Sequence, residues 1–196
     1  MIPRHFQITI ALLLAGILLS GIYMMRLRRE EQAVSQEVRP AAPAAPPVLG
    51  RQEHIRVLVA YDDDQALRWR ETDAFMPEDR ALRAREALRA VLAQYLQEPS
   101  PHRLGKGTDI KEVYLIGEDT MVVDTTRAFA DGHPSSILFE DLTLCSLIET
   151  LAANVPGVAK VKFLVEGQER ETLAGHADLM SFYQTNAVHE LAKEFE

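Results

Sequence analysis

The chain contains little of the chemistry by which enzymes and metalloproteins are usually detected. Cys145 is the one cysteine among 196 residues, so an internal disulfide, a C-x-x-C redox pair and a multi-cysteine zinc site are all excluded. The motifs G-x-S-x-G, H-E-x-x-H and G-x-x-x-x-G-K-[ST] are absent as well. Cys145 falls within an apolar helical pattern, which is typical of a small core residue. The sequence therefore assigns no catalytic residue, no metal ligand and no cofactor, and its binding residues stay unknown.

The remaining polar groups form no recognisable site. No two of the five histidines after Gly50 are four residues apart on a predicted helix: His54, His102, His133, His176 and His189. The acidic run Asp62–Asp64 lacks the alternating spacing of a calcium loop, so we expect a solvated turn. The glycine-rich segment LGKGT (104–108) leads into a strand and not a helix, so we expect a turn and not a phosphate cradle. A catalytic carboxylate pair would be visible only in three dimensions, so an enzymatic role stays open.

A basic surface is also lacking. The residues after Gly50 hold 16 lysines and arginines against 26 aspartates and glutamates, a net charge of about −10. Such a surface repels polyanions, which argues against nucleic acid or anionic lipid as the main partner. A cluster of arginines within 77–97 is expected to pair with nearby acids on a solvated face: Arg80, Arg83, Arg85 and Arg89.

The chain does have one long apolar run, FQITIALLLAGILLSGIYMM, at residues 6–25. As a helix rising about 1.5 Å per residue, it spans the roughly 30 Å hydrocarbon core of a bilayer. A signal peptide has an apolar core of only about 7–15 residues and a small-residue cleavage site, and this run matches neither feature. We therefore predict a retained membrane anchor at residues 1–29, in contact with the membrane through residues 6–25.

Residues 30–53 are predicted to form a linker. They are rich in proline and alanine, and the sequence VRPAAPAAPPVLG contains four of the ten prolines. Polyproline geometry, at about 3.1 Å per residue, would let the linker reach up to roughly 70 Å from the membrane. Arg26, Arg28 and Arg29 follow the span and Arg4 precedes it, so the positive-inside rule alone leaves the orientation open.

Residues 54–196 are predicted to fold as one domain. Hydrophobic periodicity predicts helices at 77–97, 138–154 and 186–195, and strands at 55–61, 111–117, 120–126, 158–167 and 171–175. This β-α-β-β-α-β-β order predicts an α+β fold: a mixed sheet of about five strands, covered on one face by two main helices. One apolar stripe of the second main helix is expected to pack on the sheet: Leu144, Leu147, Ile148 and Leu151.

The order of these segments resembles the sporulation and spore-germination GerMN domain over residues 55–178. The resemblance rests on the opening strand VLVAY, the helix end AVLAQYLQEPSP, the turn and strand GKGTDIKEVYL, and the strand MVVDTTRAF. It continues through the serine-led helix SSILFEDLTLCSLIETLA and the closing VAKVKFLVEGQERETLAG. Glu98 departs from the glycine that the family more often has before the proline. The segment ETDAFM and the tail after Asp178 are not covered.

The resemblance implies a compact α/β domain on the outer side of the cytoplasmic membrane, behind an anchor or lipid attachment. It implies an envelope, sporulation or peptidoglycan-linked role without an established catalytic activity. Two functions follow as expectations. The favoured one is a non-enzymatic interaction module that binds an envelope protein or a cell-wall glycan. The alternative is a cell-wall hydrolase or accessory enzyme with an unrecognised carboxylate site.

Overall fold

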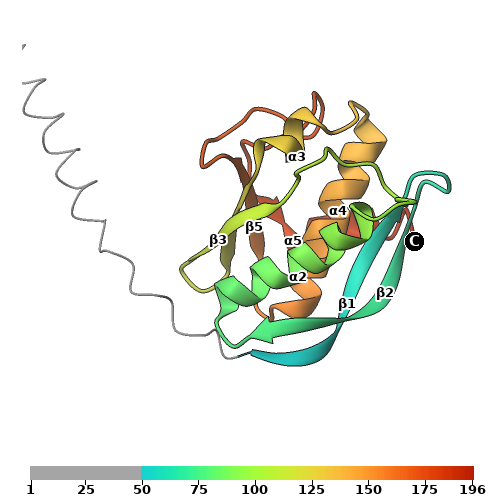
Figure 1. The fold of residues 1–196 in the computed structure, drawn as a ribbon. Helices are drawn as coiled ribbons and strands as arrows, with labels where there is room; N and C mark the ends of the chain where they lie inside the picture. The colour runs from blue at the N-terminus through green and yellow to red at the C-terminus, as the bar shows by residue number, and fades with distance from the viewer. Residues whose placement is uncertain (1–49) are drawn as a thin grey trace, which may run out of the picture. The chain divides into compact units, whose positions relative to one another are not determined.

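The computed structural model describes residues 50–196 (Figure 1). The predicted anchor at 1–29, and the predicted linker up to residue 49, lie outside the described residues. Within residues 50–196, no helix is both long enough and apolar enough to cross a bilayer. The first strand begins at Gly50, five residues before the start predicted from its β-branched core.

The described chain forms two sheets and four helices. Strands β1 (Gly50–Tyr61) and β2 (Ala66–Pro77) pair as an antiparallel hairpin. The second sheet has the order β3 (Ile110–Ile116), β4 (Thr120–Thr125), β5 (Lys160–Val165) and β6 (Tyr183–Gln184), with β4 and β5 parallel and the other pairs antiparallel. The helices are α2 (Arg80–Tyr95), α3 (Arg127–Asp131), α4 (Ile137–Asn154) and α5 (Thr185–Ala192).

The α+β class is confirmed, but the single five-stranded sheet is wrong. The residues ETDAFM, to which the sequence assigned no structure, belong to β2. This strand pairs with β1 in a separate two-stranded sheet. The predicted strand at 171–175 is also wrong: in this stretch only an isolated bridge joins Thr172 to Asp178, and the last strand is β6. Helix α3 was not predicted, because five residues are too few to show a helical period.

The start of α2 differs from the prediction. Pro77 ends β2 and does not open the helix. Asp79 is the N-cap, and its carboxylate accepts a hydrogen bond from the backbone N–H of Leu82 at 2.9 Å. Along the helix, Arg83 forms a two-pronged ion pair with Glu53 of β1, with the shorter contact at 2.5 Å. The predicted pairing of the arginines with acids is therefore confirmed for this residue.

Helix α4 is the centre of the domain and is buried on nearly every side. Its apolar stripe lies in one hydrophobic core together with the inward-facing residues of β5: Val161, Phe163 and Val165. Figure 1 shows α4 between the β1–β2 hairpin and the four-stranded sheet, with α2 crossing in front of it. A helix that is enclosed on all sides must also satisfy the polar groups of its neighbours.

A second stripe of α4 is polar and meets the free edge of β1. Ser146 donates to the carbonyl oxygen of Leu58 at 2.6 Å, and the amide of Leu58 donates to Thr150 Oγ1 at 2.9 Å. One turn further, Asn154 Nδ2 donates to the carbonyl oxygen of Arg56 at 2.7 Å. The three polar side chains are spaced four residues apart, so they lie along one helix face.

Tyr95, at the end of α2, completes the cover of this edge. Its hydroxyl accepts from the amide of Ala60 at 2.8 Å and lies 2.5 Å from Ser146 Oγ. Side chains therefore take the hydrogen bonds that a third strand would supply. This is the physical reason that the hairpin stays separate from the four-stranded sheet.

We predict that Thr150→Val lowers the free energy of unfolding by about 1–3 kcal/mol, because the amide of Leu58 is left buried without an acceptor. Valine has nearly the same shape, so the loss reports the hydrogen bond. Urea unfolding of the purified chain measures the change. The matched control is Thr120→Val. The Thr120 side chain is half-buried, and its hydroxyl donates only to the carboxylate of the neighbouring Asp119. An equal change in both variants would contradict this role of α4.

Candidate functional site

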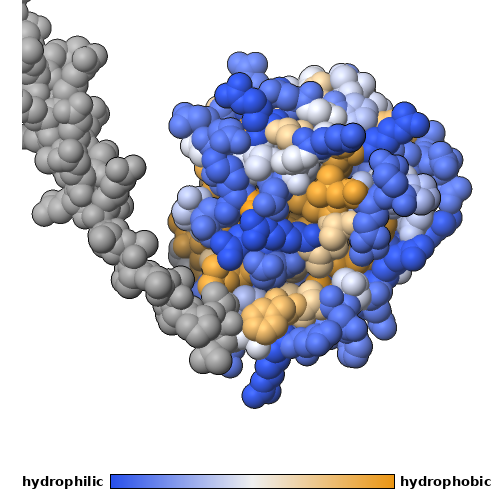
Figure 2. All heavy atoms as spheres, in the orientation of Figure 1, coloured by the Kyte–Doolittle hydropathy of each residue, from blue (hydrophilic) through white to orange (hydrophobic). Residues whose placement is uncertain are grey.

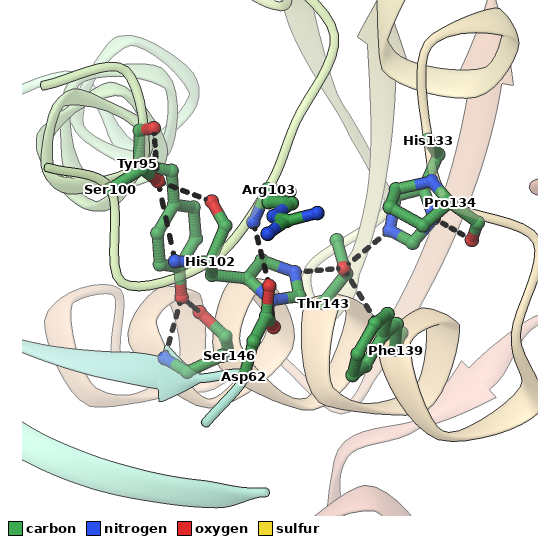
Figure 3. Close-up of polar contacts among 11 residues, drawn as sticks. Asp62, Tyr95, Ser100, His102, Arg103, His133, Pro134, Phe139, Thr143 and Ser146 are labelled. Atoms are coloured by element: carbon green, nitrogen blue, oxygen red, sulfur yellow. Dashed lines mark hydrogen bonds and ion pairs between the residues drawn. The ribbon is translucent and has the colours of Figure 1, made fainter. Parts of the chain in front are cut away.

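The densest group of chemistry-bearing side chains lies where three loops meet α4. Asp62 follows β1, His102 belongs to the loop between α2 and β3, and His133 precedes α4 (Figure 3). His102 Nδ1 lies 2.5 Å from Asp62 Oδ1, and His102 Nε2 lies 2.6 Å from Thr143 Oγ1. His133 Nε2 lies 2.6 Å from the same hydroxyl oxygen. We call these four residues the histidine cluster.

The histidine cluster joins directly to the side chains that cover β1. The ring of Tyr95 meets the ring of His102 edge-on, with a centroid distance of 4.9 Å. In the same loop, Ser100 Oγ lies 2.6 Å from the carbonyl oxygen of Tyr95 and 2.6 Å from that of His102, and its single hydrogen serves one of the two contacts. The loop between α2 and β3 is therefore held against α4 by one continuous polar network.

The electrostatics of the histidine cluster follow from burial and from its hydrogen bonds. Burial alone would raise the pKa of Asp62, but the hydrogen bonds from His102 and from the amide of Arg103 outweigh it and hold the pKa below its ordinary value. Burial lowers the pKa of His133, because the imidazolium form loses hydration there.

The order carboxylate, imidazole, hydroxyl is also that of a nucleophilic triad. Here His102 and Thr143 are each 0% exposed, so a substrate has no access to the hydroxyl oxygen. Thr143 Oγ1 is moreover within 2.9 Å of three polar atoms, two on the histidines and one on Phe139. The chemistry of the histidine cluster is therefore used to hold the fold together.

No local pattern in the sequence connects these residues. His102 and His133 are scattered along the chain, and the structure brings both to Thr143, which had no assigned role. The solvated turn is wrong for Asp62, whose side chain is mostly buried against His102. It holds for the rest of the run, since Asp63 is exposed and Asp64 forms a surface ion pair with Arg68 at 2.6 Å.

Glu140 forms a second buried polar site on α4. Its carboxylate accepts from the backbone amides of Ala174, His176 and Ala177, at 2.8–3.1 Å, and contacts the ring of His176 at 2.9 Å. Burial alone would raise the pKa of Glu140, but these donors outweigh it and lower the pKa. Glu140 therefore fastens the segment before β6 to the central helix.

Cys145 and the glycine-rich segment behave as the sequence predicted. Cys145 is buried in the core, and burial raises its pKa to about 12, so its thiol stays protonated at neutral pH. The glycine-rich segment is a turn closed by the amide of Thr108 donating to the carbonyl oxygen of Gly105 at 3.1 Å. Gly105 packs so closely on Gly132 that a Cβ atom would lie 2.7 Å from its Cα. No group of three or more metal-ligating side chains is positioned to hold an ion within residues 50–196.

Apolar side chains remain exposed around the face of the four-stranded sheet that is opposite the core, while Val122 (7% exposed) and Lys162 (8%) at the middle of this face are buried. Tyr114, Val122 and Lys162 lie side by side on β3, β4 and β5, and Ile116 follows Tyr114 on the same face. The Lys162 ammonium lies 5.3 Å from the centre of the Phe182 ring and donates to the carbonyl oxygen of Met180. We call this surface the open sheet face. Four of its apolar side chains are about half exposed: Tyr114 (50%), Ile116 (56%), Met180 (45%) and Phe182 (46%).

The side of the domain around α2 has a different character. Figure 2 shows hydrophilic side chains covering most of it, with smaller hydrophobic areas between them. Its arginines form ion pairs or donate to backbone carbonyl oxygens. Arg80, for example, donates to the backbone carbonyl oxygens of Glu118 and Pro156.

A family profile described as sporulation and spore germination, Germane, matches residues 59–171, more than half of the chain. The chain belongs to the Germane family. This confirms the resemblance found in the sequence motifs.

Two solved structures match the chain. The tandem GerMN domains of the sporulation protein GerM from Bacillus subtilis match with a TM-score of 0.51 and 16% identity over 70% of this chain and 48% of that one. The chain thus spans about half the length of that structure. A candidate lipoprotein from Clostridium perfringens matches with a TM-score of 0.48 and 17% identity over 74% of this chain and 94% of that one. A comparison with curated proteins finds no match.

We predict that Glu140→Gln destabilises the domain by about 1.5–3 kcal/mol at pH 7, because charged hydrogen bonds become neutral ones. Since the pKa of Glu140 is lowered, the carboxylate contributes stability above its ordinary pKa of 4.5 and loses it as the pH falls through the lowered value. Thermal unfolding between pH 7 and pH 3 should show that the melting temperatures of the wild type and of Glu140→Gln become equal in acid. The matched control, Glu171→Gln, changes an exposed carboxylate of the same segment, and a constant gap across this pH range would contradict the assignment.

Proposed function

We propose that this Germane-family chain is a non-enzymatic interaction module of the cell envelope. Residues 6–25 hold it at the cytoplasmic membrane, and residues 54–196 act on the outer side. The apolar run, the proline-rich linker and the family membership support this arrangement together.

The observation that carries the proposal is the open sheet face. Half-exposed apolar side chains that gather on one surface mark sites of association, whereas the histidine cluster and Glu140 are closed to solvent. Two of the exposed side chains are not aromatic: Ile116 is aliphatic and Met180 is a thioether. Such groups gain most by burial against another apolar protein surface, while glycans stack chiefly on aromatic rings. The favoured partner is therefore an envelope protein.

The hydrolase alternative requires two carboxylates facing each other across a cleft. On α4, burial and the charge of Glu140 raise the pKa of Asp141, while the pKa of Glu140 is lowered. However, consecutive helical residues point about 100° apart, and Glu140 is 0% exposed. This pair therefore lacks the open, facing geometry that glycoside hydrolysis needs, and the interaction module is the better supported function.

We predict that Tyr114→Ser/Ile116→Ser weakens partner binding by about tenfold or more without unfolding the domain, because central apolar anchors carry most of the binding energy. A photo-crosslinking amino acid at position 116 in native membranes should give a discrete protein adduct. The control double variant is Phe75→Ser/Ile137→Ser, which removes equally exposed apolar groups outside this face.

Equal adducts from positions 116 and 137 would contradict the assignment of the surface. If the crosslinking residue at position 116 gives no protein adduct, and the Tyr114→Ser/Ile116→Ser variant loses binding to purified cell-wall glycan, the partner class is wrong.

We also predict an outward-facing C-terminus. A reporter enzyme that is active only outside the cytoplasm, fused after Glu196, should be active in intact cells. A reporter that is active only inside should be silent at the same position. The reverse pattern would show that Arg26, Arg28 and Arg29 set the orientation and would reject the extracytoplasmic role.

A further inference from the structure

The outer edge of β2 carries backbone groups that point away from the hairpin. Figure 1 shows β2 on the side of the hairpin away from α4. On β1, the backbone groups that bond to α4 and Tyr95 belong to every second residue: Arg56, Leu58 and Ala60. The residues between them therefore form the hydrogen bonds with β2. By the hairpin register, the backbone N–H and C=O groups of Trp69, Glu71 and Asp73 then point outward.

The start of this edge already pairs with backbone from outside the sheet. The amide of Leu67, which also points outward, donates to the carbonyl oxygen of Phe195 at 2.8 Å. The indole of Trp69 donates to Glu196 Oε1 at 3.3 Å. Beyond this contact, the outward backbone groups from Trp69 to Phe75 have no hydrogen-bond partner within residues 50–196. The edge therefore accepts a backbone partner at one end and is open along the rest.

Strand β2 lacks the features that usually stop an edge strand from pairing. Such strands are typically short, bulged, or interrupted by proline or lysine. This strand has 12 residues, and its register with β1 runs from Ala66 to Pro77 without a shift. It contains no lysine, and its one proline is its last residue. The backbone of this edge can therefore pair with another strand.

The charges along the edge disfavour pairing with a second copy of the chain. A closed two-fold dimer would join β2 antiparallel to itself. In the registers centred on Trp69 or Arg70, arginines lie opposite arginines. In the registers centred on Glu71, Thr72 or Asp73, carboxylates lie opposite carboxylates. Like charges directly opposite each other destabilise a strand pair, so a strand of a different sequence fits this edge better.

Two charged side chains of the edge have no ion pair within residues 50–196. Both are exposed: Arg70 and Glu71. The guanidinium of Arg70 lies 5.5 Å from the centre of the Tyr61 ring, and no carboxylate is paired with it. The neighbouring charges are engaged, since Arg68 contacts Asp64 at 2.6 Å and Asp73 contacts His54 at 2.5 Å. Because side chains alternate along a strand, Arg70 and Glu71 lie on opposite faces of the sheet.

We propose that the outer edge of β2, from Trp69 to Phe75, binds an extended segment of another protein as an added antiparallel strand. The segment places an acidic side chain beside Arg70 and a basic side chain beside Glu71. Backbone hydrogen bonds supply the affinity, and the flanking charges select the segment. This edge is separate from the open sheet face, so the proposal does not depend on the partner of that face.

Peptide titration of the full chain in detergent micelles tests the edge. Trp69 is the one tryptophan of the chain, so its fluorescence reports binding at this place. The probe is the synthetic peptide acetyl-TVKTKEVE-amide, in which the second lysine faces Glu71 and the first glutamate faces Arg70. We expect a saturable change in fluorescence. At saturation, the exchange of the Glu71 and Asp73 amides should slow by about tenfold or more.

The control peptide is acetyl-TVETEKVK-amide, which has the same composition with lysine and glutamate exchanged. It should bind about tenfold more weakly or worse, because every charge then meets a like charge. Equal binding of the two peptides would overturn the proposal. So would a fluorescence change that leaves the exchange of the edge amides unaltered. Edge amides that are already protected without peptide, increasingly so at higher protein concentration, would show that a second copy occupies the edge.

The variant Arg70→Glu/Glu71→Arg exchanges the two charges and keeps the net charge. It should bind the first peptide about tenfold more weakly or worse, and acetyl-TVKTEKVE-amide should restore the binding. The matched control, Glu190→Lys/Lys193→Glu, exchanges an exposed ion pair of α5 and should bind the first peptide as the wild type does. Loss of binding without restoration would contradict the charge selection. If the variant does not fold, the two peptides on the wild type decide alone.

Discussion

The fold depends on one constraint: the free edge of β1 is buried, so its backbone groups must be paired. Helix α4 meets this requirement with Ser146, Thr150 and Asn154, and Tyr95 from α2 adds the last acceptor. An unpaired buried amide would cost about 1–3 kcal/mol, and two such amides, those of Leu58 and Ala60, lie on this edge. The helix can therefore neither slide nor rotate relative to the hairpin without losing hydrogen bonds. Its opposite side is then directed toward the four-stranded sheet, and a single core forms between them.

This constraint also separates the parts of the molecule that support the fold from those that are free to act. Thr143 lies on the same helix, and the loops that bring His102 and His133 to it close one end of the core. Glu140, three residues before Thr143 on α4, binds the segment before β6. The side chains that suggest chemistry are thus engaged inside the protein. The open sheet face, the surface of the proposed interaction, lies outside these engaged side chains.

The sequence predicts the parts of this fold that repeat with a period. The leucine stripe of α4 and the alternation in β5 are visible because local geometry alone sets their spacing. Strand β2 was missed since its exposed middle, from Arg68 to Asp73, shows no alternation of apolar residues. The contacts of Thr150 and Thr143 join positions up to 92 residues apart, and no local pattern encodes such pairs. The candidate sites that depend on tertiary contacts could therefore not be predicted. The role of Cys145 could be predicted, because it depends only on burial in an apolar helix face.

The central claim is that helix side chains replace a strand along β1, and amide hydrogen exchange of Leu58 and Ala60 tests it most directly. Both amides point to side-chain acceptors and have no backbone partner on that edge. If the account is right, they exchange only when the whole domain unfolds, as slowly as the most protected amides of the β1–β2 hairpin. If they exchange orders of magnitude faster, at the rates of an open sheet edge, α4 does not close this edge and the account is wrong.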